Sequence, residues 1–466
     1  MNWNALLPEL ILSAGILVIF FLELILKEKY YKTLSLLGFI TVVASAFSIF
    51  YVHYPATTLL GGFTVSGFSL LAKFILLAVT GLVLISSYDF FSNKDSVYSE
   101  IPYLYLIALL GFMFMLSSGN LAIIFVGLEL ASITMYILVG LLRREYLSKE
   151  GAYKYLVIGT AGTSMYVLGS ALIYGSTGSL AVKSLGSKDP IFAFGVLFLI
   201  FALALKVSAV PFHFWTPDAY EGAPTPTTSF LATVPKIAFY FLLVKLTLYL
   251  FSALPSWKII VAVVAIASMF YGNFMAYAQR SVKRLLAYSS IAHAGYFVLA
   301  LTSVDLLLMS ALLFYVVVYA VATLGAFTVL SVLEKKEGWS HHFLDFKGLF
   351  REHPYLSSAL ALFLFALIGI PPMAVFVGKL SIFMGLVKND LLIFAIAFAV
   401  ASIISAGYYL KVIVYMFLHP RERAMAPARV SAGESFTLML TGVLILLLGI
   451  FPGFLMDWIR FTLFHE

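Results

Sequence analysis

Cysteine is absent from this 466-residue sequence, which excludes disulfides, thiolate metal sites and cysteine-held iron–sulfur clusters within the chain. Charged residues are also scarce: they form 11% of the chain, against about 25% in an ordinary soluble protein. No phosphate-binding glycine loop, metal-ligand cluster or nucleophile–base set occurs along it. We therefore expect no cofactor and no metal in this chain.

Long apolar runs fill the sequence instead. Hydrophobic residues make up 62% of it, in runs of about 20 residues or slightly more, the length of a tilted membrane-spanning helix. The pattern predicts an all-α polytopic membrane protein in a lipid bilayer, with one transmembrane domain over 1–466. About fourteen spans are expected, at 4–26, 33–52, 68–89, 102–117, 119–142, 151–174, 190–210, 225–251, 257–278, 284–303, 305–333, 354–388, 390–418 and 435–460.

Two of these spans are predicted to be broken helices. The seventh ends at Pro211, and the segment His213 to Gly222 is expected to continue as a short half-helix. The twelfth is too long for one straight crossing and contains Pro371 and Pro372. Such breaks bring free backbone groups and water to the depth of the membrane midplane.

The loop charges indicate an orientation. The net charge of +7 does not indicate nucleic-acid binding, because the cations lie in short loops between apolar runs. Loops after even-numbered spans hold four: Lys183, Lys188, Lys258 and Lys388. Loops after odd-numbered spans hold eighteen: Lys27, Lys29, Lys32, Lys94, Arg143, Arg144, Lys149, Lys154, Arg280, Lys283, Arg284, Lys335, Lys336, Lys347, Arg351, Arg421, Arg423 and Arg429. Since positive loops stay in the cytoplasm, both termini are predicted on the outer face.

Other ionisable groups lie within the spans, where a charge is costly unless it faces protein, water or a partner. Lys206 and Lys236 flank the break of the seventh span, and Glu129 lies at the centre of the fifth. We interpret them as parts of an ion path. The alternatives are snorkelling for the lysines and a helix–helix hydrogen bond for Glu129. His293, in the tenth span, is either a packing hydrogen bonder or a proton relay.

For the other charged residues we expect structural roles. Three further cations are expected to snorkel to the surface: Lys73, Lys245 and Arg460. The charged stretch 334–354 is expected to be solvated cytoplasmic surface. Asp218 and Glu221 could feed protons inward, but capping or salt bridging is the simpler expectation.

The spacing of the lysines suggests an internal repeat. Lys206 and Lys236 are 30 residues apart, Lys379 and Lys411 are 32 apart, and each interval begins in a proline-broken span. A shift of five spans inverts one copy relative to the other, as in inverted-repeat transporters. The expected parts are a first five-helix inverted repeat at 101–251, a second at 257–419, and flanking helices at 1–100 and 435–466.

Three stretches resemble the antiporter-like membrane subunits of respiratory complex I. They are LKVSAVPFHFWTPDAYEGAPTPTTSFLATVPKIA (205–238), QRSVKRLLAYSSIAHAGY (279–296) and GIPPMAVFVGKLSIF (369–383). Together with the expected spans, the resemblance covers nearly the whole chain. It is strongest to the N-type subunit, because the eighth span carries lysine in VPKIA and the chain stops after span fourteen, without the long lateral helix of the L-type.

The resemblance implies roles for matching positions. Glu129 corresponds to the family's fifth-span glutamate, Lys206 and Lys236 to its seventh- and eighth-span lysines, and Lys379 to its twelfth-span lysine. Lys411 falls where an arginine or lysine is common. In the motif VFVGK (375–379), Val375 stands where the family usually has glycine, and the rest of the motif matches.

The implied activity is proton translocation within NADH:quinone oxidoreductase, in the inner (plasma) membrane. Lys206 would change protonation with its distance to Glu129, which we expect to be roughly 4–8 Å. Lys236 would pass protons laterally, and Lys379 would exchange them with the outer side. Redox chemistry would occur in partner subunits, and the neighbours would be other antiporter-like and small transmembrane subunits.

Three alternatives remain open from the residues. The first is a subunit of a multisubunit Na⁺(K⁺)/H⁺ antiporter or of a membrane-bound hydrogenase-type complex. The second is a carrier of another solute, which predicts a midplane pocket rather than a trail of charges. The third is a purely structural membrane subunit, which the mid-span charges disfavour.

The topology can be tested directly, because a chain without cysteine allows single labels. Cysteines introduced singly near Asn2 and near Glu466 should react with an impermeant thiol reagent in sealed cells, because both termini are predicted outside. Protection of both positions would overturn the orientation.

Overall fold

A computed structural model of the chain describes residues 3–26, 31–58, 61–92, 99–184, 186–251, 254, 257–335, 338–420 and 428–464. Its long helices are α1 (Leu7–Leu26), α2 (Tyr31–Ser48), α3 (Gly67–Ser92), α4 (Ile101–Leu116), α5 (Leu121–Val139), α6 (Tyr146–Thr177), α7 (Pro190–Lys206), α9 (Thr225–Tyr249), α10 (Trp257–Ala278), α11 (Val282–Ala300), α12 (Leu306–Glu334), α15 (Pro354–Ile368), α16 (Ala374–Lys388), α17 (Leu392–Leu418), α18 (Ala432–Ile450) and α19 (Gly453–Phe464). Shorter elements are η1 (Trp3–Leu6), η3 (Ile49–Tyr51), η4 (Val182–Ser184), α8 (Trp215–Gly222), α13 (Phe343–Phe346), α14 (Leu349–Glu352) and the hairpin strands β1 (Ala56–Thr58) and β2 (Phe63–Val65).

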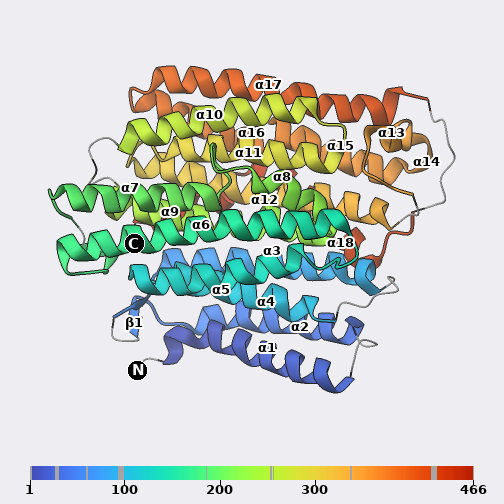
Figure 1. Cartoon of the computed structure of the whole chain (residues 1–466). Helices are drawn as coiled ribbons and strands as arrows, with labels where there is room; N and C mark the ends of the chain where they lie inside the picture. The colour runs from blue at the N-terminus through green and yellow to red at the C-terminus, as the bar shows by residue number, and fades with distance from the viewer. Residues whose placement is uncertain are drawn as a thin grey trace.

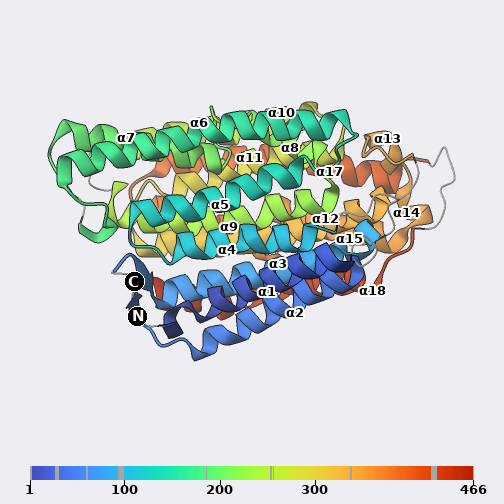
Figure 2. The ribbon, with the colours of Figure 1, turned by 60° about the horizontal axis from the view of Figure 1, so that its bottom comes forward.

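The helices lie side by side along a common direction, and the turned view shows the same arrangement (Figures 1 and 2). Several chain segments meet at one end of the bundle: Asn4 donates a hydrogen bond to the Tyr51 carbonyl, and a Cβ on Gly67, at the start of α3, would lie 3.3 Å from Tyr54 and 3.5 Å from Thr462 of α19. The short helices α13 and α14 lie at the opposite end (Figure 1).

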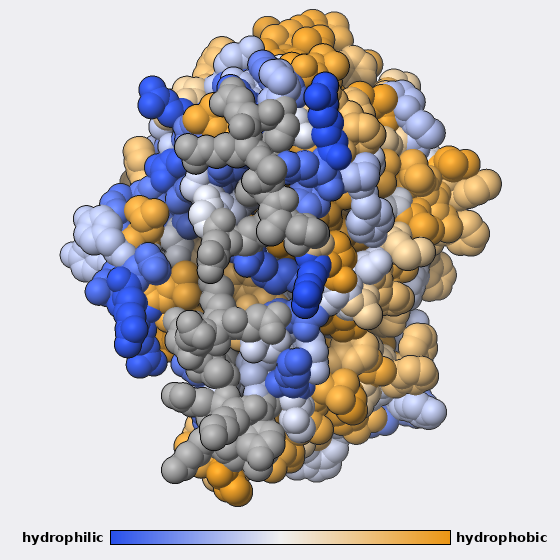
Figure 3. Space-filling model, turned by 90° about the vertical axis from the view of Figure 1, so that its right-hand side faces the viewer, coloured by the Kyte–Doolittle hydropathy of each residue, from blue (hydrophilic) through white to orange (hydrophobic). Residues whose placement is uncertain are grey.

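Hydrophilic side chains gather at the α13–α14 end of the bundle, beside a hydrophobic flank (Figure 3). Exposed cations of three predicted cytoplasmic loops are Arg144, Arg280 and Arg351. Some of the loop cations that determine the predicted orientation lie outside the described residues, as do both termini: Lys27, Lys29, Lys94, Lys336, Arg421 and Arg423, with Asn2 and Glu466. The side on which the termini lie stays a prediction.

Ten helices of the described part are long and apolar enough to cross a membrane: α1, α2, α3, α5, α6, α9, α10, α12, α17 and α18. The other predicted spans fall on helices that are shorter or less apolar, namely α4, α7, α11 and the α15–α16 pair. The chain is therefore an all-helical polytopic membrane protein in architecture, as its composition predicts.

The helices α9 and α12 form the middle of the bundle. Nearly every residue of both is buried, and α12 packs against α9, α15, α16, α18 and α19. Outer helices approach closely where both carry glycine. A Cβ on Gly111 of α4 would lie 2.6 Å from the Gly127 carbonyl of α5, so this crossing requires glycine.

Both predicted helix breaks are present. The chain leaves helical structure between the end of α7 and the start of α8, and again between α15 and α16. The first break begins at Lys206, earlier than Pro211, because Ser208 already adopts a left-handed φ of 66°. The predicted half-helix is α8.

The last predicted span, 435–460, is wrong as a single helix. It is divided into α18 and α19 at Phe451 and Pro452. Proline lacks a backbone N–H and restricts the residue before it, so the helix ends there.

Two of the three expected snorkelling cations are buried instead, which makes that expectation wrong. Lys73 is fully buried, and its Nζ lies 2.6 Å from the Glu9 Oε1. Lys245 is also buried, whereas Arg460 remains 40% exposed beside Asp457. The reason for Lys73 is packing: α3 is in contact with α2, α4, α9, α18 and α19, which leaves its side chain no path to the surface.

The stretch 334–354 is not simply solvated surface. Trp339, His341 and Phe343 are buried, and Val282 and Phe343 form backbone hydrogen bonds that hold this loop against the α10–α11 turn. The loop therefore closes one end of the bundle, because its aromatic side chains need apolar surroundings that the helix ends provide.

The buried ion pair of Glu9 and Lys73 leads to a prediction about the stability of the fold. Lys73→Met should destabilise the subunit by about 3–5 kcal/mol, because it leaves the Glu9 carboxylate buried without its cation. The double variant Glu9→Gln/Lys73→Met should recover most of that loss. Thermal unfolding of the purified protein in detergent measures both, and a single variant as stable as wild type would contradict the prediction.

Candidate functional site

Glu129 and Lys206 form an ion pair between α5 and α7. The Lys206 Nζ lies 3.6 Å from the Glu129 Oε1, closer than the predicted range of roughly 4–8 Å. The ammonium group also donates to Ser132 Oγ at 3.0 Å and to the Tyr136 hydroxyl at 3.4 Å. Snorkelling is therefore not the state of Lys206 in this structure.

The surroundings of the pair strengthen its attraction. The Lys206 side chain is 3% exposed and the Glu129 side chain 18% exposed. At an effective dielectric of about 20, two unit charges at this separation attract by roughly 5 kcal/mol. Thr163 of α6 donates to the same Glu129 oxygen at 2.6 Å, so the carboxylate also has a neutral partner.

The helix break positions Lys206 as the last residue of α7. Backbone groups freed by the break find side-chain partners: the Trp215 Nε1 donates to the Leu205 carbonyl at 3.2 Å, and the Val210 N–H donates to Ser268 Oγ at 2.8 Å. Irregular backbone is tolerated inside a membrane protein when such partners are present. Lys206 therefore lies at the end of α7, directly before a non-helical segment whose backbone groups are hydrogen-bonded.

Lys236 lies on α9 and is buried. Its Nζ donates to the Ser290 carbonyl of α11 at 2.8 Å and lies 5.4 Å from the centre of the Tyr319 ring. No carboxylate of the described residues forms an ion pair with it. The preceding residue, Pro235, cannot bond the carbonyl four residues earlier, Leu231, and the Tyr220 hydroxyl lies 3.5 Å from that oxygen.

His293 is fully buried on α11 and joins three helices. Its Nδ1 lies 2.9 Å from the Tyr315 hydroxyl of α12, and its Nε2 lies 3.3 Å from the Tyr409 hydroxyl of α17. Both ring nitrogens therefore have hydroxyl partners, each able to donate or accept.

Lys379 lies on α16 and binds the end of α15. Its Nζ donates to the carbonyls of Leu367 and Ile368 at 3.2 and 2.8 Å, and to Ser402 Oγ of α17 at 2.9 Å. A helix C-terminus carries partial negative charge, so the cation is well placed there. Gly369 permits the approach, because its φ is +86° and a Cβ would lie 3.1 Å from the Lys379 Cδ.

Lys411 is not brought together with these residues. Its Nζ lies 4.6 Å from the centre of the Phe343 ring and 5.7 Å from the centre of the Tyr277 ring. Nine residues, or about 13 Å of helix, separate it from Ser402, which binds Lys379.

Aromatic residues that the sequence analysis missed connect the separate groups. The Tyr319 ring lies beside Lys236 and also packs on His293, with ring centres 4.6 Å apart. On the other side, the Tyr296 ring packs on His293 at 5.4 Å and lies 5.3 Å from the Lys379 Nζ. The spacing of Tyr315 and Tyr319, four residues apart on one helix face, was the available signal.

Asp218 and Glu221 follow the simpler expectation. Asp218 forms ion pairs with Lys154 at 2.6 Å and with Arg284 at 2.8 Å, and Glu221 accepts a hydrogen bond from Ser281. Asp218 therefore ties α6, α8 and α11 together.

Comparison with known proteins places this architecture in a family. The family described as NADH:quinone oxidoreductase/Mrp antiporter, TM, matches residues 118–405, which include Glu129, Lys206, Lys236 and Lys379. NADH-quinone oxidoreductase subunit N 1 of Aquifex aeolicus (strain VF5) is 68% identical over 459 residues, covering 98% of this chain and 99% of that protein. The chain belongs to the NADH-quinone oxidoreductase subunit N family.

Further similar proteins agree. Subunit N 2 of Hydrogenobaculum sp. (strain Y04AAS1) is 46% identical, over 99% of this chain and 100% of that protein. Among solved structures, a chain of respiratory complex I from Thermus thermophilus is 30% identical with a TM-score of 0.84, covering 97% of this chain and 98% of that one. A chain of the Mrp complex from Dietzia sp. DQ12-45-1b has a TM-score of 0.87 at 20% identity, over 99% of this chain and 97% of that one, and shows the shared fold alone.

The contact between Gly369 and Lys379 generates a prediction. Gly369→Ala should destabilise this chain by about 1–2 kcal/mol, because a side chain at this positive φ is strained and crowds the lysine. Gly175→Ala in α6 is the matched control: nothing lies near its Cβ, and it should be neutral or stabilising. Thermal unfolding in detergent measures both, and equal stability of the two variants would refute the assigned role of Gly369.

Proposed function

We propose that this chain is the proton-translocating subunit N of an NADH:quinone oxidoreductase and moves protons along its buried Glu, Lys and His residues. The observation that carries the proposal is the buried contact of Lys206 with Glu129 at the break of α7. A lysine held in a membrane bundle by one carboxylate can change protonation when that contact lengthens or shortens.

The first element of the path is the Glu129–Lys206 switch. With the pair closed, the carboxylate favours the ammonium form of Lys206. If a rearrangement of the partner subunits made the Glu129 side chain rotate away from Lys206, Ser132 and Tyr136 of the same helix would remain as neutral partners that hold the lysine less strongly as a cation. Proton release from Lys206 would then be coupled to that movement.

The second element runs from Lys236 through His293 to Lys379. Tyr319 and Tyr296 lie between these groups, and both nitrogens of His293 have hydroxyl partners. Water or small side-chain rotations would have to complete the transfers. In this proposal Lys236 passes protons laterally and Lys379 exchanges them with the outer side, while Lys411 has a minor role.

Assembly and topology complete the proposal. The chain would contain fourteen spans, with inverted five-helix repeats at 101–251 and 257–419 and flanking helices at 1–100 and 435–466, and both termini on the outer face of the inner (plasma) membrane. Its partners would be other membrane subunits of complex I. It would hold no redox cofactor, so electron transfer would occur in those partners.

Glu129→Gln tests the switch. In the assembled complex in vesicles, proton pumping and coupled electron transfer should each fall by about tenfold or more, since positioned proton-transfer groups typically contribute 10²–10⁴-fold. The reason is that glutamine keeps the shape of the side chain and removes the charge that favours protonated Lys206.

Thr163→Val is the matched control, because it removes a hydrogen bond to Glu129 but leaves the charge pair. It should retain most pumping. If the glutamine variant matches wild type in assembly, turnover and proton-to-electron ratio, Glu129 is a packing residue and the switch is wrong.

A further inference from the structure

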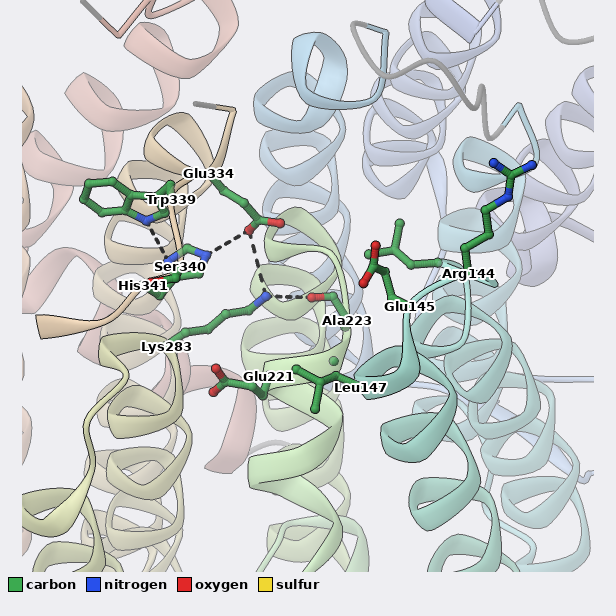
Figure 4. A pocket seen from close by; sticks show the side chains of 12 residues that line it. Arg144, Glu145, Leu147, Glu221, Ala223, Lys283, Glu334, Trp339, Ser340 and His341 are labelled. Atoms are coloured by element: carbon green, nitrogen blue, oxygen red, sulfur yellow. Dashed lines mark hydrogen bonds and ion pairs between the residues drawn. The ribbon is translucent and has the colours of Figure 1, made fainter. Parts of the chain in front are cut away.

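A pocket of about 550 Å³ lies at the proposed cytoplasmic end of the bundle. Its rim includes the exposed residues Arg144, Glu145 and Ser340, and its inner wall includes Lys283 and Glu334 (Figure 4). Side chains of both charge signs line it. A polar pocket of this volume is roomy enough to hold water.

Glu334, the last residue of α12, contacts three other residues at this pocket. Its Oε2 accepts a hydrogen bond from Thr225 of α9, lies 3.1 Å from the His341 Nε2, and lies 3.9 Å from the Lys283 Nζ. Figure 4 shows the other carboxylate oxygen turned toward the pocket without a drawn contact. The carboxylate thus joins the water side of the pocket to the protein interior.

One face of α12 continues inward from Glu334. Ser331, Phe327, Thr323, Tyr319 and Tyr315 follow at intervals of three or four residues, which places them on a single side of the helix. This side faces the lysine path, because Tyr319 lies beside Lys236 and Tyr315 binds His293. The face therefore leads from the pocket to the proposed site.

Where this face of α12 is apolar, neighbouring helices supply the polar groups. At Phe327 the face is apolar, but Tyr220 of α8 packs on that ring and its hydroxyl lies 3.5 Å from Ser290 Oγ. Ser290 in turn supplies the carbonyl that binds Lys236. Polar atoms thus continue past the apolar ring toward the lysine.

Some buried hydroxyls on or beside this face lack a hydrogen-bond partner within the described residues. Ser331 of α12 and Ser229 of α9 are each 3% exposed, and their Oγ atoms form no hydrogen bond within the described part of the chain. Buried hydroxyls are nearly always satisfied, by protein or by water. Their position between Glu334 and Lys236 therefore indicates bound water along the α9–α12 contact.

We propose that Glu334 is the proton-uptake residue of this chain, which passes protons from the pocket along the water-containing α9–α12 contact to Lys236. A proton from pocket water binds the carboxylate, leaves it for an internal water, and is accepted by the neutral amine of Lys236, which restores the carboxylate. Thr225, which binds Glu334, and Lys236 are eleven residues apart on α9. The path along this helix from Thr225 to Lys236 is therefore about 16 Å long. The inference rests on the proposed proton translocation and assigns its uptake side.

The uptake proposal is tested with Glu334→Gln in the whole complex in vesicles. Glutamine can still accept the Thr225 hydrogen bond but cannot carry a proton, so pumping and coupled turnover should fall by about tenfold or more with normal assembly. Glu150→Gln, which removes a carboxylate from the same end of the bundle outside the pocket, should leave both unchanged.

Chemical rescue distinguishes proton transfer from structure. A small proton carrier such as imidazole, added on the pocket side, should restore much of the pumping of Glu334→Ala, because its protonated form, imidazolium, can deliver protons in place of the carboxylate. If Glu334→Gln does not assemble, Ser331→Ala should assemble and slow pumping. Wild-type pumping by either assembled variant, or an absence of rescue, overturns the uptake role.

Lys236→Met separates this proposal from the function on which it rests. If Lys236→Met loses pumping while Glu334→Gln keeps it, uptake occurs elsewhere and proton translocation stands. If neither variant is impaired, the proposed function itself is wrong.

Discussion

A protonated lysine inside an apolar bundle needs oxygen atoms around it, because the bilayer supplies none. The buried lysines meet this need in different ways. Lys206 uses a carboxylate and two hydroxyls, Lys236 a single backbone carbonyl, and Lys379 two carbonyls at a helix end with one hydroxyl. Since these environments hold a proton with unequal strength, one residue type can serve in different steps of one path.

Two of these oxygen atoms, the Leu367 and Ile368 carbonyls, are available because a helix ends. The end of α15 exposes the carbonyls that bind Lys379, and the end of α7 leaves Lys206 at a junction held by Trp215. Proline within α9 leaves the Leu231 carbonyl without its usual partner. The helix end thus supplies part of the polar surroundings of Lys379, because carbonyls at a helix C-terminus have no intrahelical partner. Lys236 instead shares the Ser290 carbonyl of the regular helix α11.

The helix α12 links the parts of the molecule that ionise. It is buried along its length, ends in the pocket at Glu334, passes Lys236 at Tyr319 and contacts His293 at Tyr315. Because the helix is rigid and tightly packed, a change at one of these points would alter the surroundings of the others. Proton uptake and lateral transfer could therefore be coordinated without a large movement of the backbone.

Several properties followed from the sequence alone. The apolar runs determined a polytopic helical architecture, the prolines determined that spans seven and twelve would break, and the motifs around Lys206, Lys236 and Lys379 indicated the family. These properties depend on local chemistry: hydrophobic length, the missing proline N–H and short sequence motifs can be read without knowledge of distant contacts.

Only the tertiary structure decided which charges meet. The sequence indicated a surface cation at Lys73, near the end of a span, but in the structure Lys73 pairs with Glu9 of α1. Likewise, Glu334 was expected to begin a solvated loop, but it contacts Thr225 of α9 and Lys283 of α11. Tyr296 and Tyr319 acquire their place between the lysines only when α11, α12 and α16 pack together. The sequence shows how much a buried charge would cost, but the partner that offsets this cost comes from a helix far away in the chain, and helix packing alone selects it.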